Sequence, residues 1–171
     1  MIDLYLGDPN DKQKLFLKDR HRHVGYGGAR GGGKSWAIRT KAILLASRFK
    51  GIKILIVRRS YPELEGNHIQ PLRQMLIGIA KYNQQHKLLT FANGSTIKFQ
   101  YCRNDADLDL FQGQEYDIIF IDEATQFSEF QLKAIAACNR GVNNFPKRMY
   151  YTCNPGGQGH EYIKRLFIDR H

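Results

Sequence analysis

The residues best suited to chemistry lie in a glycine-rich stretch, GYGGARGGGKSW, at residues 25–36. Gly28 and the run Gly33-Lys34-Ser35 match the pattern G-x-x-x-x-G-K-[ST] at every fixed position. Glycines let backbone N–H groups converge on phosphate oxygens, and the N-terminus of a following helix adds a favourable dipole. Lys34 can reach the terminal phosphates, and Ser35 can bind Mg²⁺. The stretch therefore predicts a phosphate-binding loop for ATP.

One residue of this loop, Arg30, is always charged and can donate two hydrogen bonds to phosphate oxygens. Because Lys34 already supplies a cation, we predict that Arg30 acts in catalysis or senses the γ-phosphate; a solvent-facing loop arginine is the alternative. Trp36 is interpreted as helix core rather than as a base-stacking residue, although it ends the predicted ATP-binding stretch. The predicted ATP-binding residues of this stretch are Gly28, Ala29, Arg30, Gly31, Gly32, Gly33, Lys34, Ser35 and Trp36.

A second chemical pattern is the segment YDIIFIDEA at residues 116–124, an apolar run that ends in two carboxylates. In open α/β sheets, ligands bind at the carboxyl ends of strands, which is where Asp122 and Glu123 fall. Asp122 is predicted to hold Mg²⁺, directly or through water. Glu123 is predicted to be the base that orients the attacking water, which a hydrolytic ATPase needs and a kinase does not. Two solvated acids at a strand end are the alternative.

A third pattern, MYYTCNPGG at residues 149–157, places Thr152 and Asn154 where another apolar strand ends. Either side chain could hydrogen-bond the γ-phosphate or the attacking water, and so report its loss. Because Asn-Pro-Gly-Gly is also an ordinary turn sequence, the pattern alone leaves turn chemistry equally open.

The elements that must position these residues alternate along the chain. Strands are predicted at 21–27, 52–58, 116–121 and 147–153, with a hairpin at 87–101 around Asn93-Gly94. Helices are predicted at 10–18, 34–49, 62–82 (broken near Gly66 and Pro71), 128–138 (capped by Ser128) and 161–167, with a short helix or loop at 105–112. This order predicts an α/β fold with a mostly parallel central sheet and helices on both faces.

The composition fits one domain with a sizeable core, since 171 residues are 42% hydrophobic. No apolar run approaches the roughly 20 residues of a membrane span, and no signal peptide is visible. The cysteines Cys102, Cys138 and Cys153 lack a metal-ligand spacing and fit a reducing compartment. The net charge of +10 includes eleven Lys or Arg and no acid between Arg20 and Arg59. That block indicates either a polyanionic partner, nucleotide or nucleic acid, or a solvated basic face, and charge alone leaves both open.

The combination of GGARGGGKS, NGSTIKF, FQGQEYDIIFIDEATQF, YYTCNPGG and HEYIKRLF resembles the ATPase domain of tailed-bacteriophage terminase large subunits, the motors that package DNA into proheads. The resemblance covers about residues 11–168. It implies a P-loop NTPase of the additional-strand, catalytic-glutamate class, in which an extra strand lies between the strands carrying the two Walker motifs. The 88 positions between Lys34 and Asp122 leave room for that strand.

The resemblance also implies roles and partners. Gln13 corresponds to the upstream adenine-recognition region, Thr152 and Asn154 fall on the coupling motif, and Arg30 matches a proposed sensor or arginine finger acting in cis. The implied cofactors are ATP and Mg²⁺, and the implied catalytic residues are Glu123, Arg30 and Lys34. The implied partners are double-stranded DNA, the portal and the small terminase subunit. We expect a homo-oligomeric ring when active, a monomer in isolation, no membrane, and the host cytoplasm at the prohead portal.

A full terminase large subunit continues into a nuclease domain with acids clustered around two metals. This sequence stops at His171 after the coupling motif, and the acids Asp105, Asp107 and Asp109 are interpreted as a solvated segment. We therefore expect a single ATPase domain over 1–171, without nuclease activity and with an incomplete lid subdomain.

Several assignments stay open in the sequence. A helicase-like P-loop ATPase acting on nucleic acid is the alternative function, because Asp122-Glu123-Ala124-Thr125 resembles the start of a DEAD-type motif; a nucleotide-dependent DNA-binding or assembly module is a third. Arg58 and Arg59 are interpreted as a surface pair rather than as contacts to DNA or to a neighbour's nucleotide. Arg103 and Arg140 are further candidates for a finger donated between subunits. His21 and His23 are interpreted as ordinary packing or exposed residues rather than metal ligands.

Overall fold

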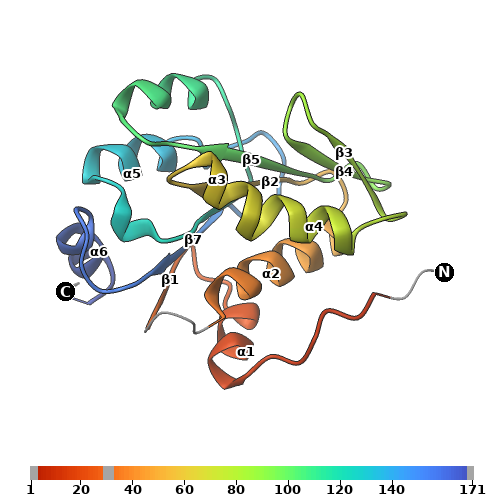
Figure 1. The fold of residues 1–171 in the computed structure, drawn as a ribbon, viewed down its shortest axis with the longest axis horizontal. Coiled ribbons are helices and arrows are strands. Elements are labelled where there is room, and N and C mark those ends of the chain that lie inside the picture. Colours follow the sequence, from red (N-terminus) through yellow and green to blue (C-terminus); the bar gives the residue numbers. More distant parts are fainter. Residues whose placement is uncertain (1–3, 29–32, 169–171) are drawn as a thin grey trace.

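The fold is built on a seven-stranded sheet in the order β1-β7-β6-β2-β5-β4-β3 (Figure 1). It was obtained as a computed structural model that describes residues 4–28 and 33–168. The strands are β1 (His23–Gly27), β2 (Lys53–Arg58), β3 (Ala80–Asn83), β4 (Leu88–Phe91), β5 (Thr96–Tyr101), β6 (Ile118–Ile121) and β7 (Arg148–Cys153). The five neighbouring strands β1, β7, β6, β2 and β5 pair in parallel, whereas the pairs β5-β4 and β4-β3 are antiparallel. The predicted mostly parallel sheet and the 87–101 hairpin are confirmed.

The extra strand between the two Walker strands is β7, which pairs with β1 on one side and β6 on the other. Its spatial position agrees with the expectation, but its place in the sequence does not. It follows Asp122 rather than lying in the interval between Lys34 and Asp122. That interval instead supplies β2, β3, β4 and β5, which lie on the far side of β6 from β7.

Helices cover both faces of the sheet, as predicted. On one face, α1 (Asp11–Lys18), α2 (Lys34–Arg48), α3 (Tyr61–Leu64), the π-helical turn η1 (Glu65–Ile69) and α4 (Gln70–Met75) pack over Ile54, Ile56 and Phe120. On the other face, the 3-10 helix η2 (Asp105–Phe111), α5 (Glu129–Ala136) and α6 (His160–Phe167) accompany Leu55, Ile119 and Ile121. Alternate residues of one strand therefore pack into two separate hydrophobic cores, one on each face of the sheet.

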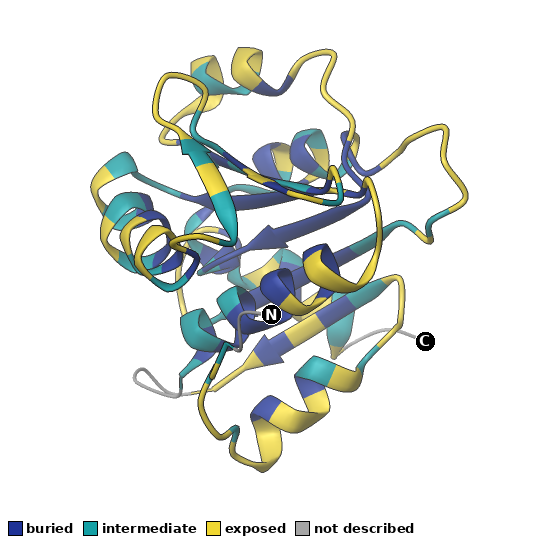
Figure 2. Ribbon diagram, turned by 90° about the vertical axis from the view of Figure 1, so that its right-hand side faces the viewer, coloured by how far each residue is buried: buried dark blue, intermediate teal, exposed yellow. Residues whose placement is uncertain are grey.

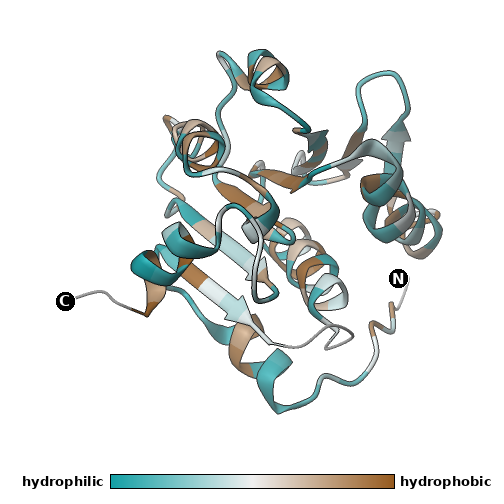
Figure 3. Ribbon diagram, turned by 60° about the vertical axis from the view of Figure 1, so that its left-hand side comes forward, coloured by the Kyte–Doolittle hydropathy of each residue, from teal (hydrophilic) through white to brown (hydrophobic). Residues whose placement is uncertain are grey.

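The central strands are apolar throughout because helices shield them from both sides. All four residues of β6 are fully buried, and β2 is buried from Ile54 onward. Figures 2 and 3 show these strands as the buried, hydrophobic middle of the molecule, with polar residues on the outer helix faces. Among the described residues, no helix is long and apolar enough to cross a membrane.

Two helices begin with a reciprocal capping box. The Ser128 side chain accepts from the Gln131 N–H, and the Gln131 side chain accepts from the Ser128 N–H, which confirms the predicted cap of α5. Asn10 and Gln13 form the same arrangement at the start of α1. The box at α1 also fixes Gln13, which reaches the phosphate loop.

The helix predicted over 62–82 is wrong at its C-terminal end. The helical segment stops at Met75, and a turn with Gly78 at φ 79° leads into β3. The four residues of β3 alternate between half-buried and exposed, as expected for an edge strand paired on one side with β4. Pro71 lies inside a continuous helical run, because Ile69 and Gln70 before it have helical backbone angles. Its missing N–H does not end the helix, and the Asn67 carbonyl oxygen one turn earlier accepts from Arg39 Nη1. The irregularity lies instead in the π-helical turn η1, which includes Gly66.

Candidate active site

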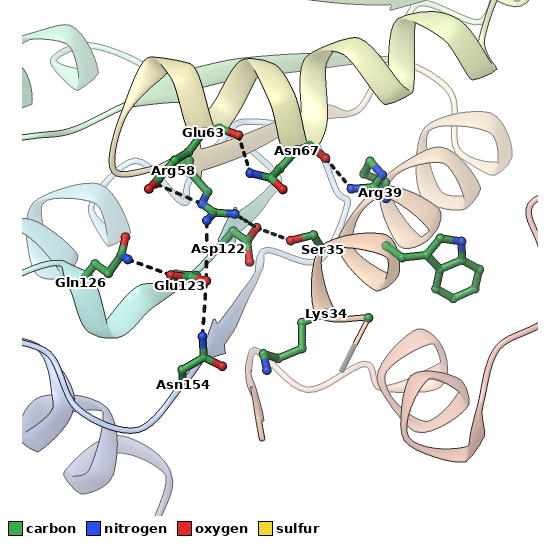
Figure 4. Close-up of a pocket in the computed structure, with 12 residues that line it drawn as sticks. Lys34, Ser35, Arg39, Arg58, Glu63, Asn67, Asp122, Glu123, Gln126 and Asn154 are labelled. Carbon is green, nitrogen blue, oxygen red and sulfur yellow. Dashed lines mark hydrogen bonds and ion pairs between the residues drawn. The ribbon is translucent and has the colours of Figure 1, made fainter. Parts of the chain in front are cut away.

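The predicted site residues meet at the carboxyl edge of the sheet. Gly27 of β1 is level with Cys153 of β7, and Ile121 of β6 is level with both Tyr151 of β7 and Val57 of β2. The residues at or just after these strand ends are therefore brought together. They surround a cavity of about 640 Å³ lined by Gly33, Lys34, Ser35, Trp36, Arg39, Arg58, Glu63, Asn67, Asp122, Glu123, Gln126 and Asn154 (Figure 4).

The phosphate loop connects β1 to α2. Gly33 adopts a left-handed φ of 73° and α2 begins at Lys34, so the helix N-terminus faces the cavity. Lys34 is 8% exposed, and its Nζ lies 3.2 Å from the carbonyl oxygen of Gly28 at the other end of the loop. Ala29, Arg30, Gly31 and Gly32 lie outside the described residues, so their predicted contacts stay predictions.

Gln13 holds α1 against the end of this loop. Its Nε2 donates to the carbonyl oxygen of Gly33 at 3.1 Å, while its Oε1 accepts from the Asn10 N–H. A Cβ at position 33 would lie 2.2 Å from Gln13 Nε2 and would displace that amide, while the left-handed φ of Gly33 independently favours glycine. Both ends of the Gln13 amide are engaged in these contacts, and its adenine-recognition role stays a prediction. Trp36 lines the cavity, and its indole N–H donates to the Leu6 carbonyl oxygen.

Asp122 is the most heavily bonded side chain of the site. Its Oδ2 accepts from the Ser35 hydroxyl at 2.8 Å and from Arg58 Nη1 at 2.9 Å, and lies 2.7 Å from His68 Nε2. Its Oδ1 accepts from the Thr152 hydroxyl. Burial favours the neutral acid, but the contacts with His68, the charge of Arg58 and the Thr152 hydrogen bond outweigh it, so the pKa of Asp122 lies well below its ordinary value. Asp122 is therefore a carboxylate.

His68 contacts that carboxylate as a neutral imidazole. It is fully buried, and burial lowers its pKa further than Asp122 raises it, with Arg39 and Arg58 adding to the depression. A neutral ring that donates from Nε2 carries its lone pair on Nδ1, and Nδ1 has no hydrogen-bond partner in the described part of the chain.

Glu123 has a strained backbone and a held side chain. Its φ of 52° is in the left-handed region, which a non-glycine residue adopts at a cost on the order of 1 kcal/mol or more. Gln126 Nε2 donates to Oε2 at 2.7 Å and Asn154 Nδ2 donates to Oε1 at 3.3 Å (Figure 4). The Glu123 N–H donates to Thr152 Oγ1 at 3.0 Å. The strain turns the chain out of β6, so that Glu123 and Asp122 both line one cavity.

The loop after β7 packs closely onto the segment after β6. The Asn154 carbonyl oxygen accepts from the Thr125 hydroxyl at 3.0 Å. A Cβ at Gly157 would lie 2.4 Å from the Thr125 carbonyl oxygen, and one at Gly159 would lie 2.2 Å from that of Phe127. Thr152 and Asn154 thus contact the two carboxylates directly, beyond ordinary turn chemistry.

The interpretation of Arg58 and Arg59 as a surface pair is wrong. Arg58 is 7% exposed and lies inside the site, because the last residue of β2 reaches the same edge as Asp122. Arg59 is half-buried and donates to the Gln126 carbonyl oxygen. His68, Gln126 and Arg39 also line or contact the site without having been predicted from the sequence. Arg58 could have been found, since it ends an apolar strand at the carboxyl edge; His68 carries no such signal, because it reaches Asp122 from a π-helical turn.

The other candidates lie apart from the cavity. Arg103 and Arg140 are exposed, and Arg140 lies 3.8 Å from the Glu115 carboxylate. His21 contacts Asp19, and His23 lies 3.4 Å from the Tyr151 hydroxyl. Across residues 4–28 and 33–168, no three His, Cys, Asp or Glu side chains form a group that could hold a metal ion.

Comparison with known protein families gives a match over most of the chain. The N-terminal part of the terminase large subunit, T4likevirus type, matches residues 26–171. The chain belongs to this family. The terminase match includes the phosphate loop, both carboxylates and the segment with Thr152 and Asn154. No significant match exists among curated protein sequences.

Solved terminase structures share the fold. The large terminase of a thermophilic bacteriophage in complex with ADP superposes with a TM-score of 0.72 at 22% identity, over 93% of this chain and 42% of that one. The ATPase domain of the Thermus phage P74-26 large terminase gives 0.62 at 14% identity, over 94% and 89%. The Phi-28 gp11 DNA packaging motor gives 0.54 at 13% identity, over 90% and 52%. The fold is that of a P-loop NTPase, and the chain spans less than half the length of the ADP-bound terminase.

Proposed function

We propose that this chain is the ATP-hydrolysing domain of a viral DNA-packaging motor. The observation that carries the proposal is the cavity at the carboxyl edge, where Lys34, Ser35, Asp122 and Glu123 line one volume of about 640 Å³. A cation at a helix N-terminus, an oxygen pair for a metal and a second carboxylate are the parts that hydrolysis of a nucleoside triphosphate requires.

The donor set fits Mg²⁺. Ser35 Oγ and Asp122 Oδ2 lie 2.8 Å apart, close to the separation of about 3 Å between neighbouring oxygen ligands of an octahedral ion with bonds of about 2.1 Å. Both are oxygen ligands, which Mg²⁺ prefers. When bound there, Mg²⁺ would neutralise charge on the β- and γ-phosphates.

The protein's own groups then have separate roles. Lys34 would contact the phosphates from the helix N-terminus, with Arg30 as a second cation. Glu123, an acceptor held by the Gln126 and Asn154 amides, would orient a water and take its proton. Thr152 touches Asp122 and the Glu123 backbone at once, so a shift of either on loss of the γ-phosphate would move β7.

The terminase family supports packaging over the helicase-like alternative. We propose that hydrolysis drives translocation of double-stranded DNA into a prohead, in a homo-oligomeric ring with the portal and the small terminase subunit, in the host cytoplasm. The ADP complex of the thermophilic phage terminase and the packaging-motor description of Phi-28 gp11 support nucleotide use and DNA as the cargo.

The test is Glu123→Gln, with the exposed Glu115→Gln as the matched control near the other end of the same strand. We expect the Glu123 variant to bind a fluorescent ATP analogue about as tightly as the unchanged protein. Its steady-state ATP turnover should fall at least about 100-fold, the usual contribution of a general base. The Glu115 variant should retain turnover. Near-normal hydrolysis by the Glu123 variant would remove the proposed base.

A further inference from the structure

Arg58 lies among three carboxylates in the wall of the cavity (Figure 4). Its Nη1 lies 2.9 Å from Asp122 Oδ2, its Nη2 lies 3.6 Å from Glu123 Oε1, and its Nε lies 3.6 Å from Glu63 Oε2. Only the first of these contacts is a hydrogen bond. The other two are ion pairs at a distance that a small movement of the guanidinium would close.

The contact with Asp122 involves the oxygen that also accepts from Ser35. Asp122 Oδ2 accepts from the Ser35 hydroxyl and from Arg58, and lies at hydrogen-bond distance from the buried His68. A carboxylate oxygen has room for about two such donors. A metal ion ligated by Ser35 and Asp122 would therefore compete with Arg58 for this oxygen.

The competition is also electrostatic. The site is buried, with Arg58 7% exposed and Asp122 1% exposed, so the repulsion between two cations is weakly screened there. A guanidinium and a divalent cation on the same oxygen repel each other. The partners that remain for a displaced Arg58 are Glu123 and Glu63, which already lie within ion-pair distance.

We propose that Arg58 is a positioning residue that changes its carboxylate partner. It neutralises Asp122 when no metal is bound, and its guanidinium moves to Glu123 and Glu63 when Mg·nucleotide binds. The exchange couples metal binding to the placement of the Glu123 carboxylate. It rests on the proposed function, because it takes Ser35 and Asp122 as the metal ligands and Glu123 as the base.

Arginine suits this role because its planar fork presents donors in several directions, so it can contact more than one carboxylate. Lysine keeps the charge but offers a single ammonium. Glutamine keeps neither the charge nor the fork. The two substitutions therefore separate competition with the metal, which needs only charge, from placement of Glu123, which needs the fork.

The experiment measures binding of a fluorescent ADP analogue across a Mg²⁺ titration, together with steady-state ATP turnover. In Arg58→Gln, we expect the half-saturating Mg²⁺ concentration to fall several-fold, since no cation competes for Asp122, while kcat falls about tenfold or more. In Arg58→Lys, the Mg²⁺ requirement should stay near that of the unchanged protein while kcat still falls. Arg48→Gln, an exposed arginine at the end of α2, controls for the change in net charge.

Thermal unfolding supplies a readout independent of turnover. Arg58→Gln should unfold at a lower temperature without ligand and gain a larger upward shift on adding Mg·ADP than the unchanged protein. An unchanged or raised Mg²⁺ requirement in folded Arg58→Gln would overturn the exchange. If that variant does not fold, an unchanged kcat in Arg58→Lys overturns it. Nucleotide binding by the unchanged protein that ignores Mg²⁺ would instead count against the metal assignment in the proposed function.

Discussion

Each end of β6 carries a buried aspartate beside cationic side chains, Asp117 before the strand and Asp122 after it. Asp117 is 2% exposed; its Oδ1 lies 2.9 Å from Lys147 Nζ, and its Oδ2 accepts from the Lys53 N–H and from Asn143 Nδ2. Asp122 is equally buried, but three donor groups crowd its Oδ2 beside an open cavity.

The two surroundings differ in how completely their polar groups are paired. Lys147 also donates to the Asn143 side chain and to the Phe145 carbonyl oxygen, so its charge is held on several sides. In the described residues beside Asp117, two buried polar atoms lack a hydrogen-bond partner, Asn139 Oδ1 and Arg148 Nε. Around Asp122 there are six: Arg39 Nε, Arg58 Nε, Glu63 Oε2, His68 Nδ1, Gln126 Oε1 and Asn154 Oδ1. A paired carboxylate stabilises the fold, whereas a crowded group of unpaired atoms marks a place prepared for a ligand.

Of the substitutions that test this contrast, Asp122→Asn should give the largest effect, a loss of ATP turnover. We expect ATP turnover to fall on the order of 1,000-fold, because several kcal/mol of charge stabilisation would be lost with the metal. The protein should still fold, since Arg58 keeps Glu63 and Glu123 nearby. Steady-state kinetics measures the loss of turnover, and circular dichroism measures whether the variant folds. Turnover within tenfold of normal would show that Asp122 is not a metal ligand.

Asp117→Asn should act on stability instead. Removing one partner of a buried ion pair leaves Lys147 without its carboxylate, which we expect to cost about 3 kcal/mol in the free energy of unfolding. Urea denaturation measures that loss. Turnover per folded molecule should remain within about twofold; a large drop in kcat would mean that the two ends of β6 are not functionally separate.

Thr152→Val tests the link between β7 and the site, and its expected effect on turnover is intermediate. The change keeps the side-chain shape but removes the acceptor of the Glu123 N–H and the donor to Asp122 Oδ1. We expect turnover to fall roughly 10-fold to 100-fold, because leaving a buried group unpaired costs about 1–3 kcal/mol. Thr90→Val, an exposed threonine of β4, is the matched control. Equal turnover in both variants would remove Thr152 from the mechanism.

The smallest expected effect is on pH dependence. The pKa of Asp122 is lowered in the folded state, so its stabilising contribution is present above the ordinary carboxyl pKa of about 4 and shrinks as pH falls below it. The difference in unfolding free energy between the unchanged protein and Asp122→Asn should therefore narrow by roughly 1 kcal/mol per pH unit below pH 4. Urea titrations at pH 6 and pH 3 measure it, and a constant difference would contradict the lowered pKa.

Much of the site could be predicted because one rule places it. Lys34, Asp122, Thr152 and Asn154 each follow or end an apolar strand, and parallel strands align those ends at one edge. The same rule applies to Arg58, but its neighbour Arg59 made the pair resemble a charged surface turn. The sequence shows where a strand ends, and only packing shows which of two adjacent arginines turns inward.

The remaining errors depend on contacts between distant segments. His68 reaches Asp122 because the π-helical turn Glu65–Ile69 rotates it inward, and the sequence does not mark that rotation. β3 exists because β4 offers an unpaired edge, while its own residues fit a helix or a strand. The spacing along the chain leaves room for the extra strand before Asp122. The fold takes it from after that residue, which spacing alone cannot distinguish.

The position of β7 between two parallel neighbours has a mechanical consequence. The strand is hydrogen-bonded along both sides, to β1 and to β6, and the loop that follows it is wedged under Thr125 and Phe127. A pull on that loop along the strand direction would load two rows of hydrogen bonds in shear, where they resist together rather than one at a time. A strand loaded in this way resists extension without unzipping.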